Sequence, residues 1–362
     1  MGNKPSIEQA LVRDASATKP HFGDILDDFR LYDGTRDALR AIAGGVEIPP
    51  ASTPKAELAE FFKKIGPIFA DVVASWAAPT PDDVESSVSK TDVVHDGVPV
   101  RILKSKTIRA GGKVPVVVYL HGGGFTMLSC KDAAYDGYLT RLAALGKCVV
   151  VAVDYRLSHT HPYPSGLDDC YNAVKWVAQG GAEGHGVPPG KVVVAGDSAG
   201  GNLAFATALK AKADGIVDST IAGMYCLCPY FAGEYKTKDY PSMMQFDGLF
   251  ISEALLAAIL GNICDDNAKE EWFKSPLLWP ILCTEKDMAG LPPCSTVVME
   301  LDMIRDMGTE MHYKLKNAGV ESYLTVTGGG IHVQQLFSKH SPYVTEQSIQ
   351  DLALFASYCS NK

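Results

Sequence analysis

The chain has 362 residues, of which 46% are hydrophobic and 21% charged, and its formal net charge is −9. These proportions are those of a soluble globular protein and exclude a disordered, collagenous or coiled-coil chain; an acidic chain without a basic cluster is also a poor partner for nucleic acid. The length fits two domains, or one large α/β domain with a lid.

The first ninety residues predict helices rather than strands. Apolar residues recur at helical spacing over residues 22–43 and 55–76, and several prolines punctuate these segments. We therefore expect residues 1–90 to form an N-terminal helical cap segment.

From about residue 98 the pattern changes to short, Val-rich strands that alternate with helices. Parallel strands that are covered on both faces are nearly continuous in apolar character. The expected strands are 98–103, 114–120, 147–153, 191–196, 221–227, 296–301 and 323–326. The expected helices are 133–145, 166–178, 198–213, 304–318 and 345–358. This alternation predicts an α/β fold, with a mostly parallel sheet of about eight strands and helices on both faces.

Residues 231–274 interrupt the alternation. They contain a Met- and Phe-rich stretch and one expected helix over 253–260, but no expected strand. Because long insertions of this kind often serve as lids, we expect a cap insertion here. The catalytic α/β domain then comprises residues 91–230 and 275–362.

The cysteines and the start of the chain predict a cytoplasmic setting. Nine cysteines are scattered without a C-x-x-C pair, and no apolar signal core or membrane-spanning run is present. We expect free, buried thiols; a zinc site on Cys226 and Cys228 is the alternative. Gly2 and Ser6 fit the N-myristoylation pattern, although one acyl chain anchors a protein weakly.

A nucleophile motif stands at residues 196–200, where Gly-Asp-Ser-Ala-Gly fits G-x-S-x-G directly between an expected strand and an expected helix. Small neighbours permit the sharp, strained turn that such a nucleophile needs, and the helix N-terminus favours developing negative charge. The motif predicts that Ser198 is a nucleophile.

A second motif, His-Gly-Gly-Gly-Phe at residues 121–125, follows the expected strand that ends at residue 120. Glycine backbone can approach a tetrahedral oxyanion closely and stabilise it through N–H groups. The expected oxyanion donors are Gly123 and Gly124, together with Ala199 beside the nucleophile. His121 is expected to hold the loop by hydrogen bonds.

A serine nucleophile needs a base and an acid that orients the base. In α/β folds with a G-x-S-x-G nucleophile turn, the three residues follow one another along the chain in the order Ser, acid, His. We favour His332 over His312 and His340, because His332 follows a Gly-rich turn after the last expected strand. We favour Asp302 over Asp306, because Asp302 follows the end of a strand, where the sites of open sheets gather.

These motifs together resemble the hormone-sensitive-lipase branch of the α/β-hydrolases, the serine carboxylesterases with an H-G-G-G oxyanion loop. The similar segments, in the family's order, are 121–125, 154–157, 161–164, 169–171, 196–203, 275–278, 291–293, 301–306 and 318–320. The resemblance implies the same catalytic and oxyanion residues, and a cap formed by the N-terminal helices and the insertion. It departs from the family at residues 158–160, where Ser-His-Thr replaces Ala-Pro-Glu, at 303–304, where Met-Ile replaces Pro-Leu, and at Val333, where a glycine is usual.

The expected reaction is two-step hydrolysis of a carboxylic ester through an acyl-enzyme on Ser198, without a metal or organic cofactor. The same triad would serve a lactonase, a lactone-forming cyclase, an acyltransferase or an amidase. An alternative of another class is a non-catalytic small-ligand receptor like the plant gibberellin receptors, which resemble this fold but lack the catalytic histidine. The expected partner is a small-molecule ester or lactone; a homodimer is compatible with the sequence.

The substrate pocket is expected to be apolar and to select a small to medium hydrophobic substrate. Large apolar side chains cluster in the insertion and beside the oxyanion loop, and methionine adapts to variable ligands. The expected pocket residues are Phe125, Met243, Met244, Phe246 and Phe250, with Leu249, Phe61 and Phe62 as further wall residues.

Overall fold

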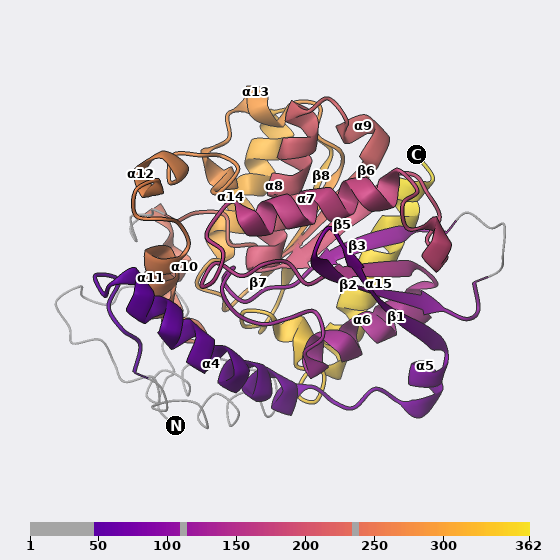
Figure 1. Cartoon of the computed structure of the whole chain (residues 1–362), viewed down its shortest axis with the longest axis horizontal. Helices are drawn as coiled ribbons and strands as arrows, with labels where there is room; N and C mark the ends of the chain where they lie inside the picture. Colours follow the sequence, from indigo (N-terminus) through magenta and orange to yellow (C-terminus); the bar gives the residue numbers. More distant parts are fainter. Residues whose placement is uncertain (1–46, 109–113, 234–238) are drawn as a thin grey trace, which may run out of the picture.

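The computed structural model describes residues 47–108, 114–233 and 239–362, and within these ranges it contains one sheet of eight strands (Figure 1). The strand order is β1-β2-β4-β3-β5-β6-β7-β8. The strands are β1 Val88–His95, β2 Val98–Ser105, β3 Val116–Leu120, β4 Val149–Val153, β5 Val192–Asp197, β6 Ile221–Leu227, β7 Cys294–Met299 and β8 Ser322–Thr327. β2 pairs antiparallel with β1 and β4, and the other pairs are parallel.

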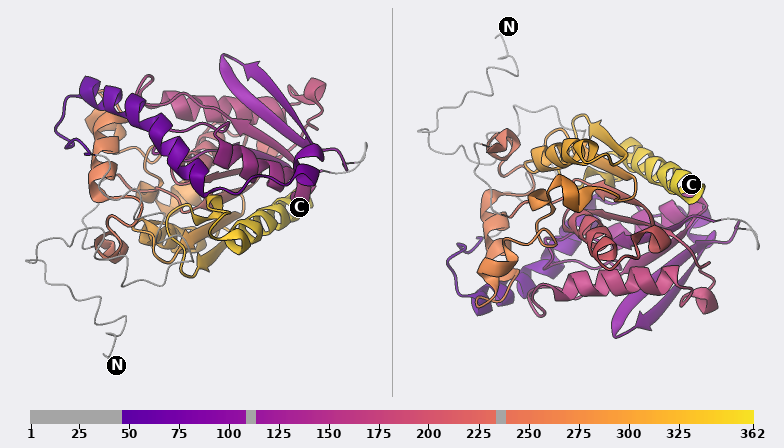
Figure 2. Two further views of the ribbon diagram at one scale, coloured as in Figure 1. Left: turned by 90° about the horizontal axis from the view of Figure 1, so that it is seen from below. Right: turned by 90° about the horizontal axis from the view of Figure 1, so that it is seen from above.

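Helices cover both faces of this sheet (Figure 1, Figure 2). α6 (Ala133–Gly146) and α15 (Pro342–Ser360) pack together on one face, and α7 (Ser165–Ala178), α8 (Ala199–Ala213) and α14 (Arg305–Asn317) lie on the other. Every residue of β3, β4 and β5 is buried. Covering on both faces explains why these strands are continuous apolar runs, and the predicted α/β architecture is confirmed.

The expected helix over 55–76 is α4 (Lys55–Trp76), which lies beside α11 (Glu253–Asn262) of the insertion (Figure 1). The Lys55 ammonium donates to the Cys264 carbonyl at 2.7 Å and to the Asp265 carboxylate at 2.9 Å, which ties the start of α4 to the chain just after α11. The expected helix over 22–43 and Gly2 lie outside the described residues. The division into domains stays a prediction.

The remaining described helices are short and lie mainly in connections. Their bounds are α5 Asp82–Ser86, η1 Glu183–His185, α9 Val217–Thr220, α10 Pro241–Gln245, α12 Lys269–Trp272, η3 Pro280–Leu282, α13 Glu285–Met288 and η4 Gln334–Leu336. The insertion thus contains α10 and α12 in addition to the expected helix.

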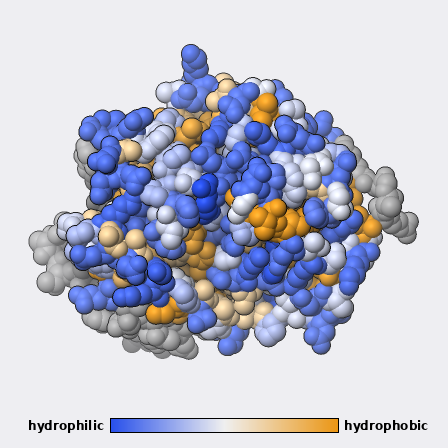
Figure 3. Space-filling view, in the orientation of Figure 1, coloured by the Kyte–Doolittle hydropathy of each residue, from blue (hydrophilic) through white to orange (hydrophobic). Residues whose placement is uncertain are grey.

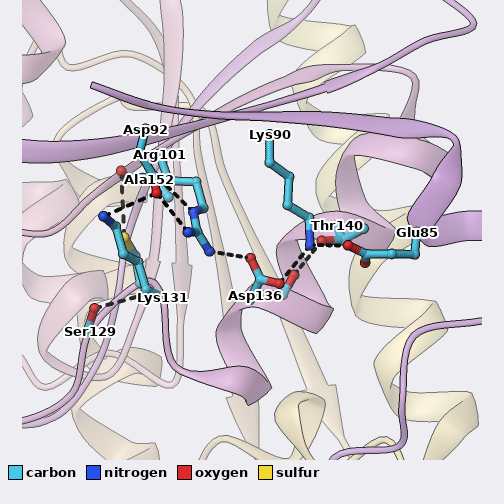
Figure 4. A network of polar contacts seen from close by, with 10 residues as sticks. Glu85, Lys90, Asp92, Arg101, Ser129, Lys131, Asp136, Thr140 and Ala152 are labelled. Atoms are coloured by element: carbon cyan, nitrogen blue, oxygen red, sulfur yellow. Dashed lines mark hydrogen bonds and ion pairs between the residues drawn. The ribbon is translucent and has the colours of Figure 1, made fainter.

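Strand β1 was not predicted, and residues 88–90 belong to it rather than to a helical segment. It is an edge strand in which polar residues interrupt three valines and half of the residues are exposed, so it lacks the apolar run of the central strands. Charged side chains fix it (Figure 4): the Arg101 guanidinium binds Asp92 and Asp136, and the Lys90 ammonium binds Glu85 and Asp136. Charged residues at a sheet edge discourage pairing with another chain.

Hydrophilic side chains cover most of the face seen in Figure 3, with small apolar patches between them. Among the described helices, none is both long and apolar enough to cross a bilayer. All nine cysteines of the chain are buried and free, as expected from their scattered positions.

Candidate active site

Four loops at the carboxyl ends of parallel strands bring the predicted chemical residues to one edge of the sheet. The glycine loop follows β3, Ser198 follows β5, Asp302 comes shortly after β7 and His332 after β8. Ligand sites of open α/β sheets form at this edge, because neighbouring strands end there in register.

The backbone of Ser198 is strained, with φ 54° and ψ −120°. A Cβ atom on Gly196 would lie 2.4 Å from the Gly200 carbonyl oxygen, and one on Gly200 would lie 2.0 Å from the Leu120 carbonyl oxygen. Only glycine fits at these two positions, which explains the spacing of the motif. The turn presents the Ser198 hydroxyl above the N-terminus of α8.

A continuous hydrogen-bonded line joins Ser198, His332 and Asp302. His332 Nε2 lies 2.9 Å from Ser198 Oγ, and His332 Nδ1 lies 2.8 Å from Asp302 Oδ2. The Ile304 amide donates to Asp302 Oδ1 at 3.0 Å and fixes the carboxylate. With Nδ1–H donating to the carboxylate, Nε2 is the ring atom that accepts the serine proton.

The electrostatics of His332 follow from burial and from the carboxylate beside it. Burial opposes a charged imidazole, but the Asp302 carboxylate and the Cys228 side chain together outweigh burial and raise the pKa of His332 above that of a free imidazole. The pair therefore stabilises an imidazolium, which is the state that forms when the base takes a proton.

The rival candidates have other partners. His312 Nδ1 lies 2.9 Å from the Ser322 hydroxyl, between α14 and β8. Asp306 lies in the first turn of α14 and accepts from the Ser242 amide at 2.8 Å, which ties α10 to this helix. His340 is in the turn before α15, where its amide donates to the Phe337 carbonyl. None of the three joins the line from Ser198.

The glycine loop has the geometry of an oxyanion cradle. Gly123 and Gly124 have φ values of 102° and 63°, and a Cβ atom on Gly123 would lie 2.1 Å from the Met127 carbonyl oxygen. Within the described residues, the amide N–H groups of Gly123, Gly124 and Ala199 donate to no protein acceptor. These three donors are thus free to bind an oxyanion.

Two histidines brace this loop. His121 Nδ1 donates to the Gly122 carbonyl at 2.7 Å, and its ring stacks on Tyr155 with centroids 4.2 Å apart. Burial lowers the pKa of His121, although the Asp154 carboxylate partly opposes this shift, so the imidazole is neutral. His159 Nδ1 donates to the Thr126 carbonyl at 2.8 Å.

His159 lies in the 158–160 segment that departs from the family pattern, and the structure gives this departure a role. Asn262 of α11 donates to the hydroxyls of Thr126, at 2.9 Å, and Ser158, at 3.3 Å. The Asn262 side chain thus helps to hold the segment in which Ser-His-Thr replaces Ala-Pro-Glu. The departure itself was the sequence signal for this contact.

An apolar cavity, with about 550 Å³ of empty space that is partly open to solvent, opens onto Ser198 and His332. Its wall comes from α4, from the segment after β3, from the loop before α11, from α11 itself and from the segments after β7 and β8. The apolar side chains that line it are Phe69, Val73, Met127, Leu128, Phe250, Ile251, Leu255, Leu256, Ile259, Ile304, Val333 and Leu336.

Of the five expected pocket residues, Phe250 lines this cavity and the other four do not. Phe125 has φ 65° and lines a second cavity of about 260 Å³. Met243 is buried, the Phe246 ring lies under the Arg305 guanidinium, and Met244 is exposed. The physical reason is the packing of α10 against α14, which turns this stretch away from the cavity.

The further wall residues were also misplaced. Leu249 is buried outside the cavity wall, and the rings of Phe61 and Phe62 meet edge to face outside this wall. The α4 residues in the wall are instead Phe69 and Val73, two and three turns further along the helix.

Within the described chain, the side chains spaced to hold a metal ion are Cys228, Asp302 and His332, with ligand atoms within 4.8 Å of one another. Asp302 and His332 already share a hydrogen bond, and burial raises the pKa of the Cys228 thiol. The Asp302–His332 pair is therefore already engaged, and a thiol that keeps its proton is a poor metal ligand. Cys226 adjoins Cys294 instead, so the two cysteines of the zinc alternative do not share a site.

Comparison of the sequence with known proteins gives a consistent result. A family model described as alpha/beta hydrolase fold matches residues 117–336. The carboxylesterase NlhH of Mycobacterium tuberculosis is 31% identical over 284 residues, which are 74% of this chain and 82% of the relative. The gibberellin receptor GID1A of Arabidopsis thaliana is 33% identical over 214 residues, which are 58% of this chain and 60% of the receptor.

Solved structures give the same picture for the fold. Brefeldin A esterase, described as a bacterial homologue of human hormone sensitive lipase, superposes with a TM-score of 0.81 at 31% identity, covering 91% of this chain and 94% of the other. The esterase Est22 superposes with a TM-score of 0.79 at 28% identity, covering 92% of this chain and 99% of the other.

Proposed function

Since this chain belongs to the α/β-hydrolase fold family, we propose that it is a serine esterase of the hormone-sensitive-lipase type, with Ser198 as nucleophile, His332 as base and Asp302 as acid. The observation that carries the proposal is the line of two hydrogen bonds, 2.9 and 2.8 Å long, that ends on a hydroxyl beside three free amide donors. The similarity to a carboxylesterase and to esterase structures supports the same reaction class.

In the first half of the reaction, Ser198 Oγ attacks the ester carbonyl while His332 Nε2 takes the hydroxyl proton. Asp302 holds the ring and stabilises the imidazolium. The carbonyl electron pair moves to oxygen, where the N–H groups of Gly123, Gly124 and Ala199 stabilise the charge. His332 then donates its proton to the leaving alcohol, and the C–O bond breaks to give the acyl-enzyme.

In the second half, water takes the place of the alcohol. His332 accepts a proton from water as the oxygen attacks the acyl carbon, and the same three donors stabilise the second oxyanion. Collapse of this intermediate returns the proton to Ser198 Oγ and releases the carboxylic acid. The site thus returns to its starting state, and the net change is one ester bond hydrolysed by one water.

The cavity favours a neutral, small to medium hydrophobic ester. Its wall is apolar except at the catalytic groups, at Asp197 and at the tyrosine hydroxyls, and its empty space of about 550 Å³ includes a part that is open to solvent. A charged acyl group would lose its hydration there without gaining a partner. A lactone substrate or an alcohol acceptor would use the same residues, so lactonase and acyltransferase activity stay alternatives within this reaction class.

The similarity to a gibberellin receptor favours a second candidate, a receptor that holds a small apolar ligand without cleaving it. A receptor needs the cavity but not the base. His332, placed between Ser198 and Asp302, favours the enzyme.

Hydrolysis of p-nitrophenyl esters from acetate to decanoate tests the proposal. We expect turnover with an optimum at short or medium chains and a loss of about 10⁴-fold or more in kcat in Ser198→Ala, because the nucleophile is gone. Full activity in a folded Ser198→Ala protein would contradict the assignment. If the wild-type protein binds these esters but does not hydrolyse them, the receptor is favoured.

A further inference from the structure

Asp197, the residue before the nucleophile, is a fully buried carboxylate that the mechanism does not use. Two tyrosine hydroxyls donate to it: Tyr119 of β3 to Oδ1 at 2.8 Å, and Tyr135 of α6 to Oδ2 at 2.7 Å. A buried carboxylate is costly unless it is hydrogen-bonded, so both hydroxyls are held firmly in place by this charge.

The Tyr135 hydroxyl has a second contact that Tyr119 lacks. It accepts a hydrogen bond from the Gly122 amide at 2.8 Å, so one hydroxyl joins the nucleophile turn to the glycine loop. The fit is tight: a Cβ atom on Gly122 would lie 2.5 Å from Asp197 Oδ2 and 2.9 Å from the Tyr135 hydroxyl. Asp197 fixes the direction of the Tyr135 O–H bond, and a lone pair of the Tyr135 oxygen then faces the Gly122 amide.

The peptide that links His121 to Gly122 is fixed at both ends. Its N–H donates to Tyr135, and its carbonyl accepts from the Tyr155 hydroxyl at 2.7 Å. The next peptide carries the Gly123 N–H, the first of the three donors. Any tilt of the fixed peptide therefore changes the direction of that donor.

We propose that Tyr135 is a positioning residue, which aims the oxyanion donors of the glycine loop by tying the Gly122 amide to the buried Asp197 carboxylate. This inference rests on the proposed esterase function. The contact acts through the loop and not on the substrate, so its main effect is on transition-state stabilisation. A misplacement of about 1 Å in a catalytic group can cost about 10²-fold in rate.

The chain offers a matched control. Tyr119→Phe and Tyr135→Phe each remove one hydroxyl from the same carboxylate, and both side chains are buried. Only Tyr135→Phe also leaves the Gly122 N–H without its acceptor. The difference between the two variants therefore isolates the link to the glycine loop from the general cost of disturbing Asp197.

The experiment measures kcat and KM for a p-nitrophenyl ester and the rate of labelling of Ser198 by a fluorophosphonate, in the full chain. We expect Tyr135→Phe to lower kcat by about 10- to 100-fold with KM changed less than about threefold, and to slow labelling similarly. Tyr119→Phe should lose less than about threefold in kcat. The thermal midpoints of the two variants should fall by similar amounts.

Three results would overturn the proposal: equal losses in kcat for the two variants, a change confined to KM, or wild-type kcat in Tyr135→Phe. A change confined to KM would make Tyr135, which lines the cavity, a substrate contact instead. If Tyr135→Phe does not fold, Tyr135→His, which retains a ring acceptor, should recover part of kcat relative to Tyr135→Leu. Absence of turnover in the wild type would reject the proposed function instead.

Discussion

The two sides of the cavity are built differently. On the sheet side, hydrogen bonds fix each group: the triad line, the Ile304 amide on Asp302 and the carbonyl held by His121. The opposite side is formed by α4 and α11, here called the lid side, and its wall residues meet the cavity through apolar contact. Directional bonds place atoms for chemistry, whereas apolar packing sets volume.

The comparison predicts that a change on the sheet side alters the rate and a change on the lid side alters the choice of substrate. The two sides meet at Gly124 and Ile259, where a Cβ atom on the glycine would lie 2.4 Å from Ile259 Cδ1. The lid thus packs directly against the proposed oxyanion loop.

The largest effect is expected from Asp302→Asn. This variant keeps the shape of the side chain but cannot stabilise the imidazolium or hold the required tautomer, and we expect kcat to fall by about 10⁴-fold. Steady-state kinetics with a p-nitrophenyl ester measures the loss. Asp306→Asn is the matched control, because Asp306 binds α10 and not His332; an equal loss there would contradict the assignment of the acid.

The pH profiles of the wild type and of Asp302→Asn sharpen this prediction. Because only neutral His332 accepts the serine proton, kcat/KM rises with pH through the pKa of this imidazole. Asp302 raises that pKa, so the acid limb of the wild type lies above about pH 6.5, the value for a free imidazole. The limb should move to lower pH in Asp302→Asn; an unchanged limb would show that another group controls it.

A smaller effect on rate, but a change in selectivity, is expected from Ile259→Ala. Removing this side chain widens the wall beside Gly124, and we expect the ratio of kcat/KM for the decanoate ester to that for the butyrate ester to rise about tenfold. The void left by the missing side chain should lower the free energy of unfolding by about 2–4 kcal/mol. Met244→Ala is the control, since Met244 is exposed; an equal shift in its ratio would contradict the lid wall described above.

The last and smallest effect is the change with pH of the stability that Asp197 contributes. Burial raises the pKa of Asp197 from 3.8 to about 6, although bonds from Tyr135 and Tyr119 oppose the shift. The folded state therefore holds this proton more tightly than the unfolded state does. The free energy of unfolding of the wild type, relative to Asp197→Asn, should fall as pH rises from about 4 to about 6, by at most about 1.4 kcal/mol per unit.

Urea unfolding of the two proteins across this pH range measures the difference. A difference that stays constant, or that grows with pH, would show that Asp197 is ionised throughout.

The chemistry could be predicted from sequence because each group follows the end of a strand that the sequence also predicts. Ser198, Asp302 and His332 stand at such positions, and parallel strands bring these positions to one edge whatever the details of packing. The glycines beside Ser198 were also predictable, since the sharp turn leaves no room for a Cβ atom. Local sequence patterns were sufficient to predict these residues.

The lid could not be predicted in the same way. Met243 and Phe246 have the composition of pocket residues, but α10 packs on α14, and this contact depends on tertiary structure. Val73 lines the cavity although nothing in its local sequence distinguishes it from Phe62, which does not. Strand β1 was missed for a similar reason, because its pairing with β2 and not an apolar pattern makes it a strand.

The central claim is that the Ser198 hydroxyl is activated by His332 beside a preformed oxyanion cradle. Reaction with a fluorophosphonate, followed by intact mass measurement and peptide mapping, tests it most directly. We predict a single adduct on Ser198, formed quickly in the wild type, slowly in His332→Ala and not at all in Ser198→Ala. An unmodified wild-type protein, or an adduct on another residue that survives Ser198→Ala, would contradict the claim.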